Sequence, residues 1–250
     1  MQKRVIVKIF IINLARALDR REFMQKQIDK FEHLDFIFFN AIDAKNGEHH
    51  TFESFYKKSL AIVNGGRELK ESERACYASH FSLWQKCIEL NEPIVILEDD
   101  IELLPEFELG LARICDCSYD YVRLFAMDTF KKPFINIDSH FALSYDEVLG
   151  AQGYYITPKA AKKFIKGSKY WVLPVDNYMD RIWMHGVRNI LHIPFLIKGD
   201  NEMSHNTTIL HRYDNDDIKK PLVYRLRREF CRLYNQIKKR LYVFMDKKFL

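Results

Sequence analysis

The stretch Ile94-Val95-Ile96-Leu97-Glu98-Asp99-Asp100 is the part of this chain that decides its fold. Four consecutive apolar residues, mostly β-branched, predict a strand that is buried on both faces. The three carboxylates that follow cannot all be buried without a counter-charge, because an ionised group in apolar surroundings is costly. Open α/β sheets bind ligands at the carboxyl ends of such strands. These residues therefore predict either a divalent-cation site for a phosphate-bearing substrate or an exposed acidic turn.

The segments around this strand predict a parallel sheet. A strand over residues 5–12, a helix over 15–31 and a buried strand over 36–39 form a βαβ unit. A further helix is expected from Ser72, a candidate N-cap, to about Leu90. The other expected elements are strands over residues 121–126, 142–145 (at a sheet edge), 153–156 and 190–197 (interrupted by Pro194), a helix opened by Pro158, and a helix over 176–185. The expected fold class is α/β, with helices flanking a mostly parallel sheet.

Composition predicts one large domain with an appendage. The chain has 250 residues and 48% hydrophobic residues, which is enough for a sizeable core. Its five cysteines form no C-x-x-C pair, so a reduced, cytoplasmic compartment is expected. No apolar run is long enough to span a bilayer, and the first residues do not form a signal peptide. The expected division is a catalytic domain over residues 1–217 and a tail over 218–250.

The tail differs from the rest of the chain in charge. Residues 219–250 hold eleven basic and two acidic residues, a net charge of +9, which leaves −4 on the other 218 residues. Apolar residues recur from Pro221 onward at spacings of three and four, which predicts a basic amphipathic helix, or two with a break. Such a helix either packs on the body or lies on an anionic membrane surface, and its length, aromatics and charge favour the membrane surface. A nucleic acid partner is not expected, because nothing in the body resembles a nucleic-acid-binding fold.

Five segments carry a family resemblance. They are Asn13-Leu14 with Arg16 and Asp19-Arg20-Arg21, Ser72-Glu73-Arg74-Ala75-Cys76-Tyr77-Ala78-Ser79-His80 with Trp84, Ile96 to Asp100, Gly153-Tyr154-Tyr155-Ile156, and Leu173-Pro174-Val175-Asp176. In this order, over roughly residues 5–200, they resemble glycosyltransferase family 25, the bacterial lipooligosaccharide β-1,4-galactosyltransferase-like group. Ala75 departs from the glycine of many members. The resemblance implies a Rossmann-type GT-A fold, a nucleotide-sugar donor and a divalent metal.

The resemblance also assigns a metal and donor site. Glu98-Asp99-Asp100 occupies the place of the D-x-D motif of GT-A enzymes, so Mn²⁺ or Mg²⁺ is the expected cofactor. Asp100 is the expected direct ligand, Glu98 an indirect metal or nucleotide contact, and Asp99 an orienting group beside the nucleotide. His205 is a candidate metal or phosphate contact. The remaining candidate donor contacts are Asn13, Arg20, Ala41, Asp43 and Gly153.

The expected reaction is an inverting transfer of galactose from UDP-galactose to a lipid-linked oligosaccharide, in lipooligosaccharide or lipopolysaccharide biosynthesis. Asp176 is the expected general base for the acceptor hydroxyl, with Asp180 one turn later as the alternative. A glucosyltransferase and a non-catalytic membrane-peripheral module are the alternative functions. The expected location is peripheral, on the inner face of a bacterial inner membrane. No zinc site is expected, because no mixed Cys/His pattern with zinc spacing is apparent, and His80 is expected to be structural.

Overall fold

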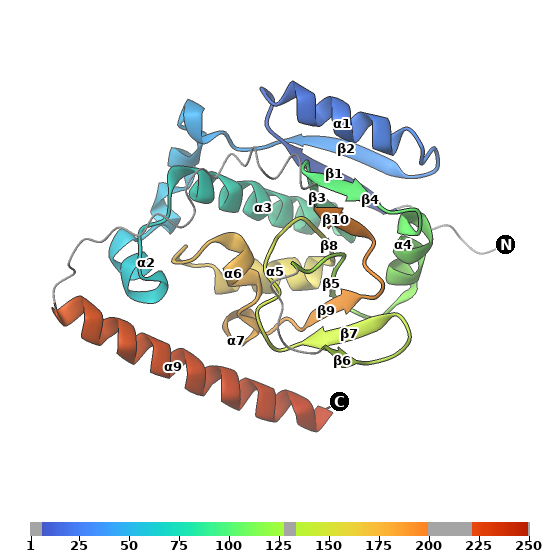
Figure 1. Ribbon diagram of the computed structural model, residues 1–250. Helices are drawn as coiled ribbons and strands as arrows, with labels where there is room; N and C mark the ends of the chain where they lie inside the picture. The colour runs from blue at the N-terminus through green and yellow to red at the C-terminus, as the bar shows by residue number, and fades with distance from the viewer. Residues whose placement is uncertain (1–6, 128–133, 200–221, 250) are drawn as a thin grey trace.

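An eight-stranded mixed sheet forms the centre of the molecule in the computed structural model, which describes residues 7–127, 134–199 and 222–249 (Figure 1). The strand order is β2-β1-β3-β8-β5-β9-β7-β6. The strands are β1 (Lys8–Asn13), β2 (Asp35–Asn40), β3 (Ile94–Glu98), β5 (Tyr121–Arg123), β6 (Ile135–Asn136), β7 (Phe141–Ser144), β8 (Gly153–Ile156) and β9 (Asn189–His192). Strands β1, β2 and β3 are parallel, whereas β7 and β8 run against their neighbours. This arrangement confirms the predicted α/β class.

Helices cover both faces of this sheet (Figure 1). They are α1 (Leu18–Ile28), α2 (Lys58–Gly65), α3 (Glu71–Leu90), α4 (Phe107–Asp116), α5 (Pro158–Gly167), α6 (Val175–Met179), α7 (Ile182–His185) and α9 (Leu222–Asp246), with 3₁₀ turns η1 (Ala44–Asn46), η2 (Glu48–Phe55) and η3 (Lys247–Phe249). A separate antiparallel ribbon pairs β4 (Ile101–Leu103) with β10 (Ile197–Gly199).

Strand β3 is buried on both faces, as its apolar run predicts. Ile94 and Ile96 join the core cluster that includes α3 and α5, whereas Val95 and Leu97 join the cluster that includes α4. Alternate side chains of a strand point to opposite faces, so one four-residue run contributes to two hydrophobic layers. The strand thereby carries its terminal carboxylates to the rim of the sheet.

Four details of the predicted elements are wrong. Strand β2 is half-buried rather than buried, because it pairs only with β1 at a sheet edge. The predicted edge strand β7 instead pairs with both β6 and β9. Ser72 lies inside α3, which begins at Glu71, where the Glu73 carboxylate accepts a 2.9 Å hydrogen bond from the Lys70 amide. The helix predicted over 176–185 is two short helices, α6 and α7.

The interruption predicted at Pro194 within residues 190–197 is confirmed, and the two parts are strands in different sheets. Strand β9 ends at His192 and β10 begins at Ile197. Pro194 lies between them, and proline cannot donate to a strand ladder. The segment between β9 and β10 therefore connects the main sheet to the antiparallel ribbon. The other strand of this ribbon, β4, begins directly after Asp100.

The predicted tail helix is present as α9, although the predicted boundary at residues 217/218 lies outside the described residues. Helix α9 runs along one side of the body and approaches α2 and α7 (Figure 1). Among the helices that the structure describes, none has the length and apolar composition needed to cross a membrane.

Candidate active site

The carboxyl ends of β1, β2 and β3 meet at one rim of the sheet. In the strand register, Asn13 lies opposite Asn40 of β2, and Ile12 lies opposite Glu98 of β3. The segments that follow these strand ends contribute Ala41 and Asp43 on one side and Asp99 and Asp100 on the other. Parallel alignment of β1 to β3 thus brings together the polar residues that the sequence placed after separate strands.

Asp99 is held inward at this rim. Its Oδ2 accepts a 2.7 Å hydrogen bond from Asn13 Nδ2, and its Oδ1 forms a 3.0 Å ion pair with Arg20 Nη1. Burial raises the pKa of Asp99, while the Asn13 hydrogen bond and the Arg20 charge oppose that rise. The carboxylate is therefore satisfied by its own chain, and it fixes the β3 end to β1 and α1.

Asp100 has the opposite environment. Its Oδ1 is buried and has no hydrogen-bond partner among the described residues. Burial raises the pKa of Asp100 to about 7, and the neighbouring charges of Glu98 and Asp99 add to the rise. A hard divalent cation would supply the missing counter-charge through the oxygen ligands that such ions prefer. The residues present therefore fit Mn²⁺ or Mg²⁺ at Asp100.

Glu98 lies at the end of a series of hydrogen-bonded side chains that extends into the core. His80 Nε2 lies 3.2 Å from Glu98 Oε1, and His80 Nδ1 lies 2.9 Å from the Tyr154 hydroxyl. Trp84 Nε1 donates to the same hydroxyl at 2.9 Å. Since His80 has no exposed surface, these hydrogen bonds hold its imidazole ring rigidly against the Glu98 carboxylate. His80 is therefore built into the fold, as expected, and it also contacts the site.

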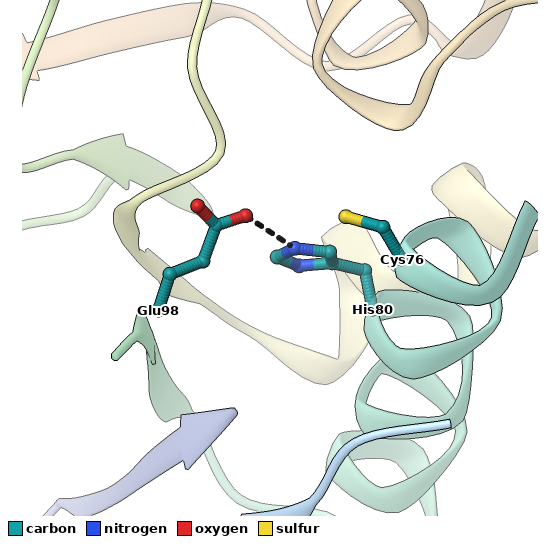
Figure 2. Close-up of side chains that lie close together, drawn as sticks. All are labelled: Cys76, His80 and Glu98. Atoms are coloured by element: carbon teal, nitrogen blue, oxygen red, sulfur yellow. Dashed lines mark hydrogen bonds and ion pairs between the residues drawn. The ribbon is translucent and has the colours of Figure 1, made fainter. Parts of the chain in front are cut away.

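Cys76 lies beside this pair and corrects the expectation about zinc. Figure 2 shows Cys76, His80 and Glu98 converging, and their ligand atoms lie within 4.8 Å of one another. Cys76 and His80 are four residues apart on α3, so helical geometry places both on one face. The sequence therefore does contain a mixed Cys/His pair at ligand spacing. The third member, Glu98, becomes visible only when α3 packs beside β3.

The predicted contacts after β2 form a small network of their own. The Ala41 amide donates to the Asn13 carbonyl at 2.9 Å, which extends the β1–β2 pairing. Asp43 accepts from the Lys45 amide at the start of η1 and forms a 2.6 Å ion pair with Arg16. The Arg16 hydrogen bond holds the pKa of Asp43 below its usual range. Asp43 is thus an ionised cap that fixes the loop beside the strand ends.

Gly153 is buried beneath the ribbon. A Cβ on Gly153 would lie 2.4 Å from Ile197 Cδ1 and 3.1 Å from Leu97 Cδ2. The preceding residue joins β8 to the site, because the Gln152 carbonyl accepts a 2.8 Å bond from the Glu98 amide. Close packing of β10 over β8 accounts for the glycine.

The two candidate bases lie in different surroundings. Asp180 forms a 2.8 Å ion pair with the buried Arg123. Asp180 also accepts from the Val148 and Leu149 amides and from Asn189 Nδ2. Asp176 lies at the start of α6, where its Oδ1 accepts from the Asn177 amide.

This contrast separates the roles of the two carboxylates. Asp180 is the counter-ion of Arg123, a strand residue whose charge the sequence pattern did not mark as buried. The remaining site candidate, His205, lies outside the described residues.

Comparisons with known proteins match this chain to one family. The model of glycosyltransferase family 25 (LPS biosynthesis protein) matches residues 6–179. A glycosyltransferase 25 family member of Aedes aegypti is 28% identical over 71% of this chain and 31% of its own length. The lipooligosaccharide biosynthesis protein lic2B of Haemophilus influenzae is 36% identical over 38% of this chain and 34% of its own. The procollagen galactosyltransferase 1-B of Xenopus laevis is 25% identical over 69% and 30%. The chain thus spans about a third of the length of these relatives.

Proposed function

Since this chain belongs to glycosyltransferase family 25, we propose that it transfers galactose from UDP-galactose to a saccharide acceptor in lipooligosaccharide or lipopolysaccharide biosynthesis, with inversion and with the help of a metal ion. The observation that carries the proposal is the buried, unpartnered Oδ1 of Asp100 at the rim of the sheet. The Haemophilus relative, a lipooligosaccharide biosynthesis protein, supports the pathway, and the Xenopus relative, a procollagen galactosyltransferase, supports the sugar.

In this proposal the three carboxylates at the end of β3 have different roles. Asp100 holds Mn²⁺ or Mg²⁺, and Glu98 assists from the strand end. The bound metal would neutralise charge that develops on the departing diphosphate. Asp99, paired with Arg20 and Asn13, keeps the β3 end in place.

Asp176 is the proposed base. A base must accept a proton from the acceptor hydroxyl, and the Asp180 oxygens already accept four hydrogen bonds from described groups. The charge of Asp176 contributes to raising the pKa of both Arg123 and Asp180, so Asp176 lies near this ion pair. The surrounding network therefore holds α6 in place while Asp176 takes the proton.

The proposed place of action is an anionic membrane surface that carries a lipid-linked acceptor, on the inner face of a bacterial inner membrane. Helix α9 docks on the body through polar groups. Lys239 pairs with Asp146 at 2.7 Å, Arg188 with Asp246 at 2.9 Å, and Trp183 Nε1 donates to Asn235 at 3.2 Å. This docking leaves the opposite side of the helix facing outward.

The outward side of α9 is apolar and is flanked by basic residues. It consists of residues with 48–72% of their surface exposed: Leu226, Phe230, Leu233, Ile237, Leu241 and Phe244. By helical geometry, Arg227 and Lys238 lie along one flank, and Arg240 along the other. An apolar stripe between cationic flanks is complementary to anionic lipid, in which acyl chains lie beneath charged headgroups.

Replacement of Asp100 by asparagine tests the metal and transfer proposal. Asp100→Asn should lower galactose transfer from UDP-galactose by about 100-fold or more, because the ligand charge is lost. It should also abolish the thermal stabilisation that UDP plus Mn²⁺ gives the unchanged chain. Glu102→Gln is the matched control, since it removes an exposed carboxylate two residues away that pairs with Lys198.

The outcomes separate the alternatives. Full turnover by Asp100→Asn would refute the metal assignment, and turnover of UDP-glucose alone would identify a glucosyltransferase. No stabilisation of the unchanged chain by UDP with either metal would indicate a non-catalytic module.

Vesicle binding tests the membrane proposal. Phe230→Ser combined with Ile237→Ser should weaken binding to phosphatidylglycerol vesicles by about tenfold or more, because two exposed apolar side chains are lost. Asn235, which faces the body, should tolerate exchange for Gln without a change in vesicle binding. Unchanged binding by the double variant would refute the docking face, and preferential binding of the chain to RNA would indicate a nucleic acid partner instead.

A further inference from the structure

A group of three side chains beside the rim offers ligands of a different kind from Asp100. Cys76 Sγ, His80 Nε2 and a Glu98 carboxylate oxygen lie within 4.8 Å of one another (Figure 2). We propose that Cys76, His80 and Glu98 bind a borderline-soft divalent cation of the zinc class, at a site distinct from that of the hard cation at Asp100.

The ligand chemistry selects the class of ion. A thiolate and an imidazole favour Zn²⁺ and Co²⁺ over Mg²⁺ and Mn²⁺, which prefer oxygen ligands. Ligand atoms around a tetrahedral zinc lie roughly 3.5 Å apart, so closure from the present separations needs side-chain movement of about 1 Å. Cys76 and Glu98 are both partly exposed, so an ion can enter and a water can take the fourth position.

The core beside the cluster supplies the support that a metal-binding histidine needs. Such a histidine donates its other ring N–H to a neighbouring group, which fixes the ring and its tautomer. Here Nδ1 of His80 faces the Tyr154 hydroxyl at 2.9 Å, and Trp84 holds that hydroxyl at 2.9 Å. The hydroxyl can donate to Nδ1 when Nε2–H bonds Glu98, and it can accept from Nδ1–H when Nε2 binds an ion.

Other cysteines in the described part of the chain lack this setting. Burial raises the pKa of the Cys87 thiol to about 12 and that of Cys115 to about 11. Among the described residues, Cys76, His80 and Glu98 form the only group of three or more His, Cys, Asp or Glu side chains whose ligand atoms all lie within 4.8 Å of one another. Position on α3 next to the β3 end therefore sets Cys76 apart from the other thiols.

The site would also regulate the reaction, a consequence that rests on the proposed function. Glu98 belongs both to this cluster and to the strand end beside Asp100. When Glu98 turns toward a soft ion, it is withdrawn from the donor metal. Zinc-class ions would therefore inhibit transfer, and removal of Cys76 would relieve the inhibition.

Cobalt binding to the whole chain, treated with chelator and without sugar donor, tests the site directly. Co²⁺ should produce thiolate-to-cobalt absorption in the near ultraviolet, and Zn²⁺ should displace it. Cys76→Ser and Cys76→Ala should both abolish this absorption and weaken Zn²⁺ binding by about tenfold or more. Cys231→Ser is the matched control, because Cys231 is likewise half-buried but lies on α9.

The two Cys76 variants must retain the circular dichroism of the unchanged chain, and having two of them protects the test against one that folds poorly. Absorption that persists in both variants, or Zn²⁺ binding that Cys76 does not affect, would overturn the proposal. Because binding is measured without donor or acceptor, a failed site is distinguishable from a failed transferase. Relief of Zn²⁺ inhibition in Cys76→Ser would then establish the regulatory consequence, and equal inhibition in both proteins would refute that consequence.

Discussion

The ion pair between Arg20 and Asp99 should stabilise the fold as well as the site. Their side chains are 11% and 10% exposed, and the joined atoms lie 3.0 Å apart. With charge centres about 4 Å apart and an effective dielectric constant of about 20, the Coulomb attraction is about 4 kcal/mol. Arg20→Met leaves a buried carboxylate that, among the described side chains, only Asn13 bonds, and breaking a buried pair in this way costs about 3–5 kcal/mol.

A double-mutant cycle isolates this pair. Arg20→Met and Asp99→Asn should each lower the free energy of unfolding by about 3 kcal/mol, measured by urea denaturation. The combined variant should lose much less than the sum, with a coupling of about 2–3 kcal/mol, because no charge is left buried alone. Asn13 can still donate to the new amide oxygen.

The coupling also decides between two roles for Arg20. A coupling free energy below about 0.5 kcal/mol, as for exposed pairs, would refute a stabilising ion pair between Arg20 and Asp99. Arg20 would then again be a candidate for phosphate binding. A large coupling together with retained stabilisation by UDP in the combined variant would place Arg20 and Asp99 outside the nucleotide contacts. Lys8→Met with Glu92→Gln provides the control, since that 3.1 Å pair is largely exposed.

Three further predictions concern packing, protonation and helix capping. Gly153→Ala should lower the urea midpoint by an amount equivalent to about 1–3 kcal/mol through overpacking, and Ile197→Val, which removes the obstructing Cδ1, should restore much of the loss. Burial lowers the pKa of His185 to about 3, so the folded state keeps this side chain neutral. The free energy of unfolding that is present above pH 6.5 should therefore fall by about 1 kcal/mol for each pH unit below 6.5. His185→Gln should reduce this slope, and exposed His33→Gln should not. Thr157→Ala removes the N-cap of α5 and should cost about 1 kcal/mol in the free energy of unfolding.

Each of these has a contrary result. Equal urea midpoints for Gly153→Ala and the unchanged chain would mean that β10 does not press on β8. A pH slope that His185→Gln leaves intact would mean that His185 charges without cost in the folded state. If Thr157→Ala unfolds at the same urea concentration as the original, the hydroxyl does not cap α5.

Local patterns in the chain were enough to predict strands β1, β2 and β3 and their parallel direction, but not that β7 and β8 run antiparallel to their neighbours. The run Ile94 to Leu97 had to be buried on both faces because each successive side chain is apolar, and that placed Glu98, Asp99 and Asp100 at a rim. Pro158 predicted the start of α5, and the tail predicted a long helix. Element ends were less predictable, because Ser72 can cap a helix or lie inside it, depending on the contacts of its neighbours.

What the carboxylates contact was decided only by the tertiary structure. Asp99 and Asp100 are identical and adjacent in the chain, yet Asp99 bonds Asn13 and Arg20, whereas Asp100 Oδ1 has no hydrogen-bond partner among the described residues. The difference arises because Asn13 at the end of β1 and Arg20 of α1 reach Asp99, whereas no described group bonds Asp100 Oδ1. Likewise, sequence spacing places Cys76 and His80 together on α3, whereas Glu98 joins them only through packing of α3 against β3. Local chemistry thus set the strand and its charges, and long-range packing assigned each charge its partner.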